Sequence, residues 1–139
     1  MTEVPDARAW PTPAPSERCP CLSGNPYGEC CRPFHTGAQS PPTAERLMRS
    51  RYSAFVVGDA AYLLASWHPS TRPAAAELSL DPAQRWYRLD IVNRTGGGML
   101  DQTGTVEFVA RYRLGTERSE LRETSTFEKL GGKWFYLAG

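Results

Sequence analysis

The sequence predicts an α+β domain, in which helices cover one face of an antiparallel sheet, preceded by a short cysteine-rich segment. Three observations lead to this prediction. Apolar residues recur at helical spacing over about 43–68. They alternate with polar residues from Trp86 onward. All four cysteines fall within 19–31. Helices followed by a run of strands are typical of α+β domains.

The first residues, 1–17, form a proline-rich segment with little apolar content. Such a segment buries too little surface to offset the entropy of ordering, so we expect a flexible leader. It lacks the apolar core of a secretion signal, and no stretch of the chain approaches the 18 apolar residues of a membrane span. We therefore expect a cytoplasmic protein without a membrane partner. The net charge of +1 implies no bulk attraction to nucleic acid.

The cysteines follow the pattern C-x-C, eight residues, then C-C, with turn-forming residues between the pairs. Four thiolates brought together in this way suit a closed tetrahedral site for structural Zn²⁺. Cytoplasmic thiols stay reduced, which disfavours a disulfide, although redox-active and inert thiols remain as alternatives. The predicted zinc ligands are Cys19, Cys21, Cys30 and Cys31.

The histidine that follows the cysteines, His35, is a candidate for a supporting role. Because four cysteines already complete a tetrahedral shell, we do not expect it to bind the metal. We expect it to pack beside the cysteine segment or to form a hydrogen bond to a sulfur as a second-shell group.

The segment "CPCLSGNPYGECC" resembles the SEC-C motif, a zinc-binding module found at the C-terminus of the SecA translocation ATPase and in many unrelated bacterial proteins. Its usual form is C-x-C-G-S-G-x(5)-C-[C/H], and the four ligand positions match the four cysteines. The resemblance implies a zinc knuckle over residues 18–35. Leu22 departs from the motif, because glycine is usual there; this departure predicts a leucine at a backbone position with positive φ.

The helical region begins after a linker, 36–42. Thr43 is a plausible N-cap and Gly58 can end the first helix in the left-handed conformation. A second helix is expected to begin at Asp59 and to continue until Pro69 stops it. A third short turn is expected near 73–78.

The remainder of the chain reads as four strands with glycine-containing turns between them. We place the strands at about 85–95, 103–114, 119–129 and 133–138. Their alternation of apolar and polar residues predicts an antiparallel sheet with one buried face.

The resemblance extends beyond the knuckle. "PFHTG", the run "PTAERLMRSRYSAFVVGDAAYLLASWHPSTRP" and the ending "FEKLGGKWFYLAG" resemble the YchJ family of uncharacterised bacterial proteins. This resemblance implies that residues 36–139 form an NTF2-like cone, a curved antiparallel sheet wrapped around helices. The family resemblance implies no particular activity.

Cones of this kind often enclose a pocket, and polar residues on the concave face of the sheet would select its ligand. Glu123 shares a strand face with apolar residues, and burial would raise its pKa and suit it to acid or base work. The simpler interpretation is an ion pair with Arg51 or Arg111. No complete catalytic constellation is present, so no catalytic residue is assigned and an enzyme is neither predicted nor excluded. The candidate pocket residues are Tyr52, Trp67, His68, Glu123 and Trp134.

Three functional hypotheses remain. The favoured one is an adaptor whose zinc knuckle docks on a protein partner. The second is an enzyme or a small-molecule-binding protein that uses the cone pocket. The third is nucleic-acid binding through the knuckle and the basic helix that carries Arg46, Arg49 and Arg51, although such a run is usually a solvated face. A homodimer formed through the sheet also remains open.

Overall fold

The computed structural model describes residues 10–139; residues 1–9 of the expected leader lie outside the described part. The α+β order predicted from the sequence is confirmed, with helices first and strands last. None of the helices in the described part is long and apolar enough to cross a membrane. The elements are η1 (Tyr27–Glu29), α1 (Arg32–His35), α2 (Ala44–Val57), α3 (Ala60–Ala65), η2 (Ala75–Glu77), β1 (Gln84–Gly96), β2 (Thr103–Leu114), β3 (Glu117–Leu130) and β4 (Lys133–Ala138).

Helix α2 is the central element, and its two ends follow the local sequence signals. The Thr43 side chain accepts a hydrogen bond from the backbone N–H of Arg46, which satisfies one of the free donors of the first turn. Gly58 ends the helix with φ 74°, in the left-handed region that glycine adopts without a steric penalty. Both predicted boundaries of this helix are therefore confirmed.

Helix α3 begins as predicted but ends earlier than Pro69. Asp59 accepts a hydrogen bond from the backbone N–H of Tyr62 at the start. At the end, the Ser66 hydroxyl donates to the carbonyl of Tyr62, which competes with continued helix formation. The following residue, Trp67, already forms a bridge to Tyr136 of β4. The helix therefore ends because the chain turns to meet the sheet.

The four strands form one antiparallel sheet in the order β1-β2-β3-β4, as the alternation predicted. The pairing of β2 with β3 is continuous, and it places Phe108 opposite Glu123. The pairing of β1 with β2 shifts twice, between Trp86 and Arg88 and near Ile91. Such irregularities bend and twist a strand, which curves the sheet around α2.

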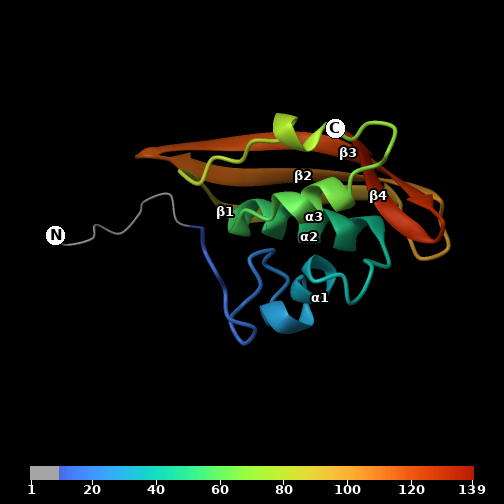
Figure 1. The fold of residues 1–139 in the computed structure, drawn as a ribbon, viewed down its shortest axis with the longest axis horizontal. Helices are drawn as coiled ribbons and strands as arrows, with labels where there is room; N and C mark the ends of the chain where they lie inside the picture. The colour runs from blue at the N-terminus through green and yellow to red at the C-terminus, as the bar shows by residue number, and fades with distance from the viewer. Residues whose placement is uncertain (1–9) are drawn as a thin grey trace.

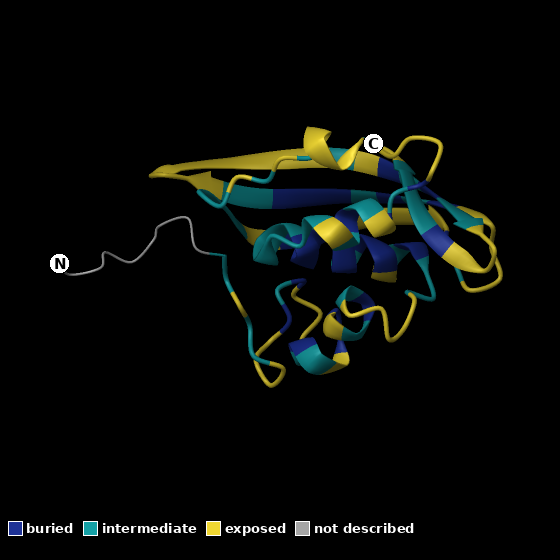
Figure 2. Cartoon of the chain, in the orientation of Figure 1, coloured by how far each residue is buried: buried dark blue, intermediate teal, exposed yellow. Residues whose placement is uncertain are grey.

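The molecule has three layers (Figure 1). The sheet is one layer, α2 and α3 pack against it, and α1 with the cysteine segment lies on the far side of the helices. Buried residues gather on α2 and on the adjoining parts of the sheet and knuckle (Figure 2). The helices-on-a-curved-sheet cone is therefore confirmed. Its core includes the four cysteines together with Leu47, Met48, Tyr52, Leu89, Val106, Phe108, Ala110, Phe127 and Trp134.

The described end of the expected leader is attached to the knuckle, which we define as residues 18–35. The backbone N–H of Tyr27 donates to the carbonyl of Glu17 at 2.7 Å, and that of Gly28 donates to Pro15 at 2.9 Å. A side chain at Gly28 would collide with Pro15, because a Cβ there would lie 2.8 Å from the proline ring. Contacts with the knuckle therefore begin before residue 18.

Candidate metal centre and cone cavity

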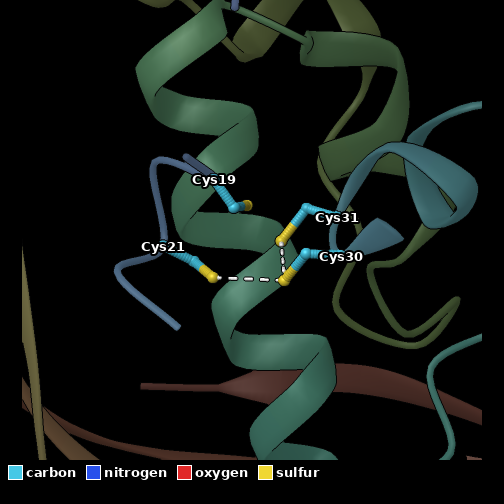
Figure 3. Close-up of side chains that lie close together, drawn as sticks. All are labelled: Cys19, Cys21, Cys30 and Cys31. Atoms are coloured by element: carbon cyan, nitrogen blue, oxygen red, sulfur yellow. Dashed lines mark hydrogen bonds between the residues drawn. The ribbon is translucent and has the colours of Figure 1, made fainter. Parts of the chain in front are cut away.

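The four cysteine sulfurs converge from two segments of the knuckle. Cys19 and Cys21 lie on one loop, Cys30 and Cys31 follow η1, and the side chains point toward one another in front of α2 (Figure 3). All four sulfur atoms lie within 4.8 Å of one another. The sulfurs of Cys21 and Cys30 are 3.6 Å apart, and those of Cys30 and Cys31 are 3.9 Å apart.

This arrangement fits a tetrahedral metal ion. A metal–sulfur bond of about 2.3 Å requires sulfur atoms roughly 3.8 Å apart, which the two distances above match. A disulfide would require about 2.05 Å, and all four cysteines are free. Each is at most 5% exposed, so a metal bound by all four thiolates would have no open position toward solvent. The cluster can therefore hold a metal in a closed site.

The protons of the metal-free cluster are shared between sulfurs. Hydrogen bonds from Cys19 and Cys31 lower the pKa of Cys21, and burial opposes them. The same bonds, to Cys19 and then Cys21, together with burial raise the pKa of Cys31. Burial also raises the pKa of Cys30 to about 11. A metal must displace these protons to bind, so its affinity should increase with pH.

Helix α2 supports the cluster through residues that the sequence analysis did not single out. The Ser53 hydroxyl donates to the Cys31 sulfur at 3.3 Å and lies 3.6 Å from the Cys19 sulfur. The Arg49 guanidinium donates to the Cys21 carbonyl at 2.9 Å. Ser53 follows Arg49 by four positions, so helical spacing could have shown that the two share a face. These contacts join the knuckle to the helix.

His35 packs beside the knuckle, which is the first of the two roles expected for it. Its Nδ1 accepts a hydrogen bond from the Tyr27 hydroxyl at 2.7 Å, and its Nε2–H donates to the Ser50 carbonyl at 2.8 Å. Neither bond reaches a sulfur. Burial lowers the pKa of His35, in agreement with a neutral ring that accepts at one nitrogen and donates at the other.

Leu22 has the backbone conformation expected at the glycine position of the motif. Its φ is 64°, and it is the one non-glycine residue in 10–139 with a positive φ. Its N–H donates to the Cys19 carbonyl at 3.1 Å, which closes the turn between the first two cysteines. The side chain is 54% exposed. The ligand positions thus impose a conformation that is unfavourable for leucine.

Leu22→Gly is expected to raise the free energy of unfolding by roughly 0.5–1 kcal/mol, because glycine relieves the left-handed strain but adds entropy to the unfolded chain. Urea denaturation of the metal-loaded chain measures this change. A suitable control is Leu130→Gly at an exposed strand position, which should lower stability. A loss of stability in Leu22→Gly would contradict the strain at this position.

The predicted pocket is present as a cavity of about 170 Å³ between α2 and the sheet. Three of the candidate residues, Tyr52, Trp67 and Glu123, line it. The other two, His68 and Trp134, lie outside it. The complete lining consists of Met48, Arg51, Tyr52, Phe55, Trp67, Trp86, Phe108, Ala110, Leu121, Glu123, Ser125 and Tyr136.

The two residues outside the cavity have other positions. Trp134 is buried and its indole N–H donates to the Pro42 carbonyl at 3.1 Å. It precedes Tyr136 by two residues on β4, which carries it away from the Glu123 end of the sheet. The Nδ1 of His68 accepts from the Ser70 N–H at 3.0 Å. Strand position therefore decides which aromatic residue reaches the cavity.

Glu123 does not form the ion pair expected as the simpler interpretation. Within residues 10–139, neither Arg51 nor Arg111 lies within ion-pair distance of its carboxylate. The carboxylate accepts a hydrogen bond from the Ser125 hydroxyl at 3.1 Å instead. Glu123 therefore lines the cavity as a carboxylate without an arginine partner.

The three arginines of the basic helix do not form one exposed surface. Arg51 is 4% exposed and donates to the Leu63 carbonyl. Arg49 is bound to the knuckle and to Glu45. Arg46 alone of the three is exposed, and its guanidinium lies 5.2 Å from the centre of the Phe34 ring. The patch on which the nucleic-acid hypothesis depended is therefore divided between three environments.

Comparison with protein families gives a match over most of the chain. Residues 43–139 match the family described as YchJ, middle NTF2-like domain. A UPF0225 protein of Corynebacterium glutamicum is 53% identical over 88% of this chain and 96% of its own length. A UPF0225 protein of Ralstonia nicotianae is 49% identical over 95% of this chain and 96% of its own length.

Two solved structures share the fold. The solution structure of a SEC-C motif containing protein from Rhodopseudomonas palustris has a TM-score of 0.77 and 31% identity, over 88% of this chain and 97% of that protein. The crystal structure of a SEC-C motif containing protein from Psychrobacter arcticus has a TM-score of 0.71 and 26% identity, over 88% of this chain and 81% of the other.

Proposed function

We propose that this chain, which belongs to the YchJ family, is a zinc-containing interaction module whose knuckle docks on a protein partner. In this proposal the metal has a structural role: it holds the knuckle in one conformation on α2. A closed four-thiolate site leaves no coordination position for a substrate. The observation that carries the docking proposal is the strained and exposed Leu22.

The choice of zinc rests on the donor set. Four thiolates in a tetrahedral arrangement select zinc or iron among the common metals, and a closed all-cysteine site is typical of structural zinc. Purified protein is expected to contain one zinc per chain under reducing conditions, as measured by elemental analysis and native mass spectrometry. Bound iron, seen by elemental analysis and visible absorption, would contradict this part of the proposal.

The docking role is argued from Leu22. Its side chain is largely exposed and its backbone is left-handed, so the residue is unfavourable in both respects within this chain. Strain of this kind is often retained at functional sites. The knuckle also exposes Arg18 and Arg32 against the single acidic residue Glu29. We infer a partner surface that offers an apolar pocket with acidic residues around it.

Site-specific photo-crosslinking in cells that express the full chain tests this proposal. A photoreactive residue at Asn25, in the exposed knuckle loop, is expected to capture one protein, whereas the same residue at Thr116, at the β2–β3 turn, is not. Leu22→Gly should abolish the capture while the chain keeps its zinc. Equal capture at both positions, or capture that survives Leu22→Gly, would count against docking through the knuckle.

A further inference from the structure

The cone cavity contains buried polar groups without partners. The Tyr52 hydroxyl and the Trp67 indole N–H have no hydrogen-bond partner within residues 10–139, and Tyr52 is only 2% exposed. An unsatisfied buried polar group costs free energy, so nearly all such groups in folded proteins have a partner. Both residues line the same cavity. A molecule bound there could supply the missing hydrogen bonds.

The cavity wall also carries an uncompensated cation. Arg51 is 4% exposed, and its printed hydrogen bonds go to neutral groups, the Leu63 carbonyl and the Ser66 hydroxyl. Its guanidinium lies 5.1 Å from the Trp67 ring centre and 4.4 Å from that of Tyr136. No carboxylate of the described residues lies within ion-pair distance of it. Buried charges usually have an opposite charge as partner.

Arg51 keeps its charge under ordinary conditions. Burial lowers its pKa to about 10, which still leaves the side chain protonated at neutral pH. The cavity therefore combines a positive charge with two unsatisfied groups that can donate hydrogen bonds, the Tyr52 hydroxyl and the Trp67 N–H. Carboxylate oxygens accept such bonds and pair with guanidinium groups.

The size and the remaining lining limit the ligand. Besides the polar groups, the walls are apolar and largely aromatic, with Phe55, Trp86, Phe108 and Leu121 among them. The volume of about 170 Å³ is close to that of an engineered protein cavity, about 150 Å³, that holds one benzene molecule. A ligand the size of one substituted ring fits this space.

We propose that the cone cavity binds a small aromatic carboxylic acid, whose carboxylate pairs with Arg51 and accepts hydrogen bonds from Tyr52 and Trp67. Glu123 lines the same cavity and would repel a second negative charge. It favours a ring that also carries a hydroxyl group able to donate to its carboxylate. This site is separate from the knuckle and does not depend on its partner.

An NMR titration of the full zinc-loaded chain with 4-hydroxybenzoate tests the proposal. The indole N–H signal of Trp67 is expected to shift and saturate, because it gains an acceptor. The signal of Trp134 provides an internal control, since that N–H already donates to Pro42. The neutral analogue 4-hydroxybenzamide should bind roughly tenfold or more weakly, and benzoate, which lacks the hydroxyl, a few-fold more weakly.

Two variants separate binding from folding. Tyr52→Phe removes an unpartnered hydroxyl, so it should raise the melting temperature of the ligand-free chain and weaken 4-hydroxybenzoate binding by roughly threefold or more. Arg51→Met should abolish binding. Arg122→Met is the matched control, because Arg122 is exposed and pairs with Glu107; its affinity should equal that of the wild type.

The proposal is overturned if none of the three probes gives a saturable shift at Trp67, or if the acid and the amide bind equally well. It is also overturned if Tyr52→Phe leaves the affinity for 4-hydroxybenzoate unchanged. Because Tyr52→Phe is expected to fold at least as well as the wild type, a folding defect in Arg51→Met does not prevent the test.

Discussion

Replacing Cys30 and Cys31 together by serine is expected to abolish metal binding and to lower the free energy of unfolding by more than about 3 kcal/mol. Two ligands of a closed site are lost, and two hydroxyl groups are placed where the thiols were 5% and 1% exposed. The knuckle then loses the ion that joins its two segments. Elemental analysis and urea denaturation measure the two effects.

Removal of the metal from the wild-type chain provides the control for this variant. A strong chelator should lower stability by a similar amount, and added zinc should restore it, whereas the serine variant should respond to neither treatment. Leu22→Gly, which keeps all four ligands, should retain its metal in the same assay. A serine variant with wild-type stability would show that the metal does not support the fold.

Phe127→Ala is expected to lower the free energy of unfolding by about 3–5 kcal/mol, because it leaves a large hole in a packed core. The side chain is 1% exposed, and its ring centre lies 6.0 Å from that of Tyr136. Phe127 belongs to the same core cluster as the four cysteines although it lies on β3. We therefore expect metal release and loss of tryptophan fluorescence to shift together to lower urea concentration.

The control for this prediction is Leu114→Ala, at a 49% exposed position near the end of β2, which should change stability by less than about 0.5 kcal/mol. Metal release measured with a colorimetric chelator and unfolding measured by fluorescence should follow one transition in every variant. Two separate transitions, with metal release unmoved by Phe127→Ala, would show that the knuckle and the cone unfold independently.

Helix α2 connects the two candidate sites. Ser53 contacts two of the cysteine sulfurs, while Arg51 and Tyr52 line the cone cavity. Because these residues are adjacent in the helix, they point in different directions around its axis. Ser50 to Ala54 are all buried, so this part of the helix has no solvent-facing side.

The local elements of the fold could be predicted because their signals lie between close neighbours in the chain. Thr43, Gly58 and Asp59 marked helix ends through capping interactions that span three or four residues. The strand positions followed from alternation. The end of α3 was placed too late because its stop depends on contact with Tyr136, which is far away in the sequence.

The candidate sites divide in the same way. Sequence spacing identified the four cysteines as one group, and the motif position of Leu22 predicted its positive φ, because a short loop imposes both. The expected surface role of Arg51 was wrong, because an amphipathic helix was assumed to keep one face in water.

By itself, the sequence determined the order of helices and strands, the cysteine cluster and the strained turn, since each depends on residues close together in the chain. Only the tertiary structure decided that the knuckle covers the second face of α2, through contacts such as Arg49 with Cys21. It also decided that Arg51 is buried against Trp67 and Tyr136. The physical reason is that burial depends on which distant segments pack together, and no local pattern records that.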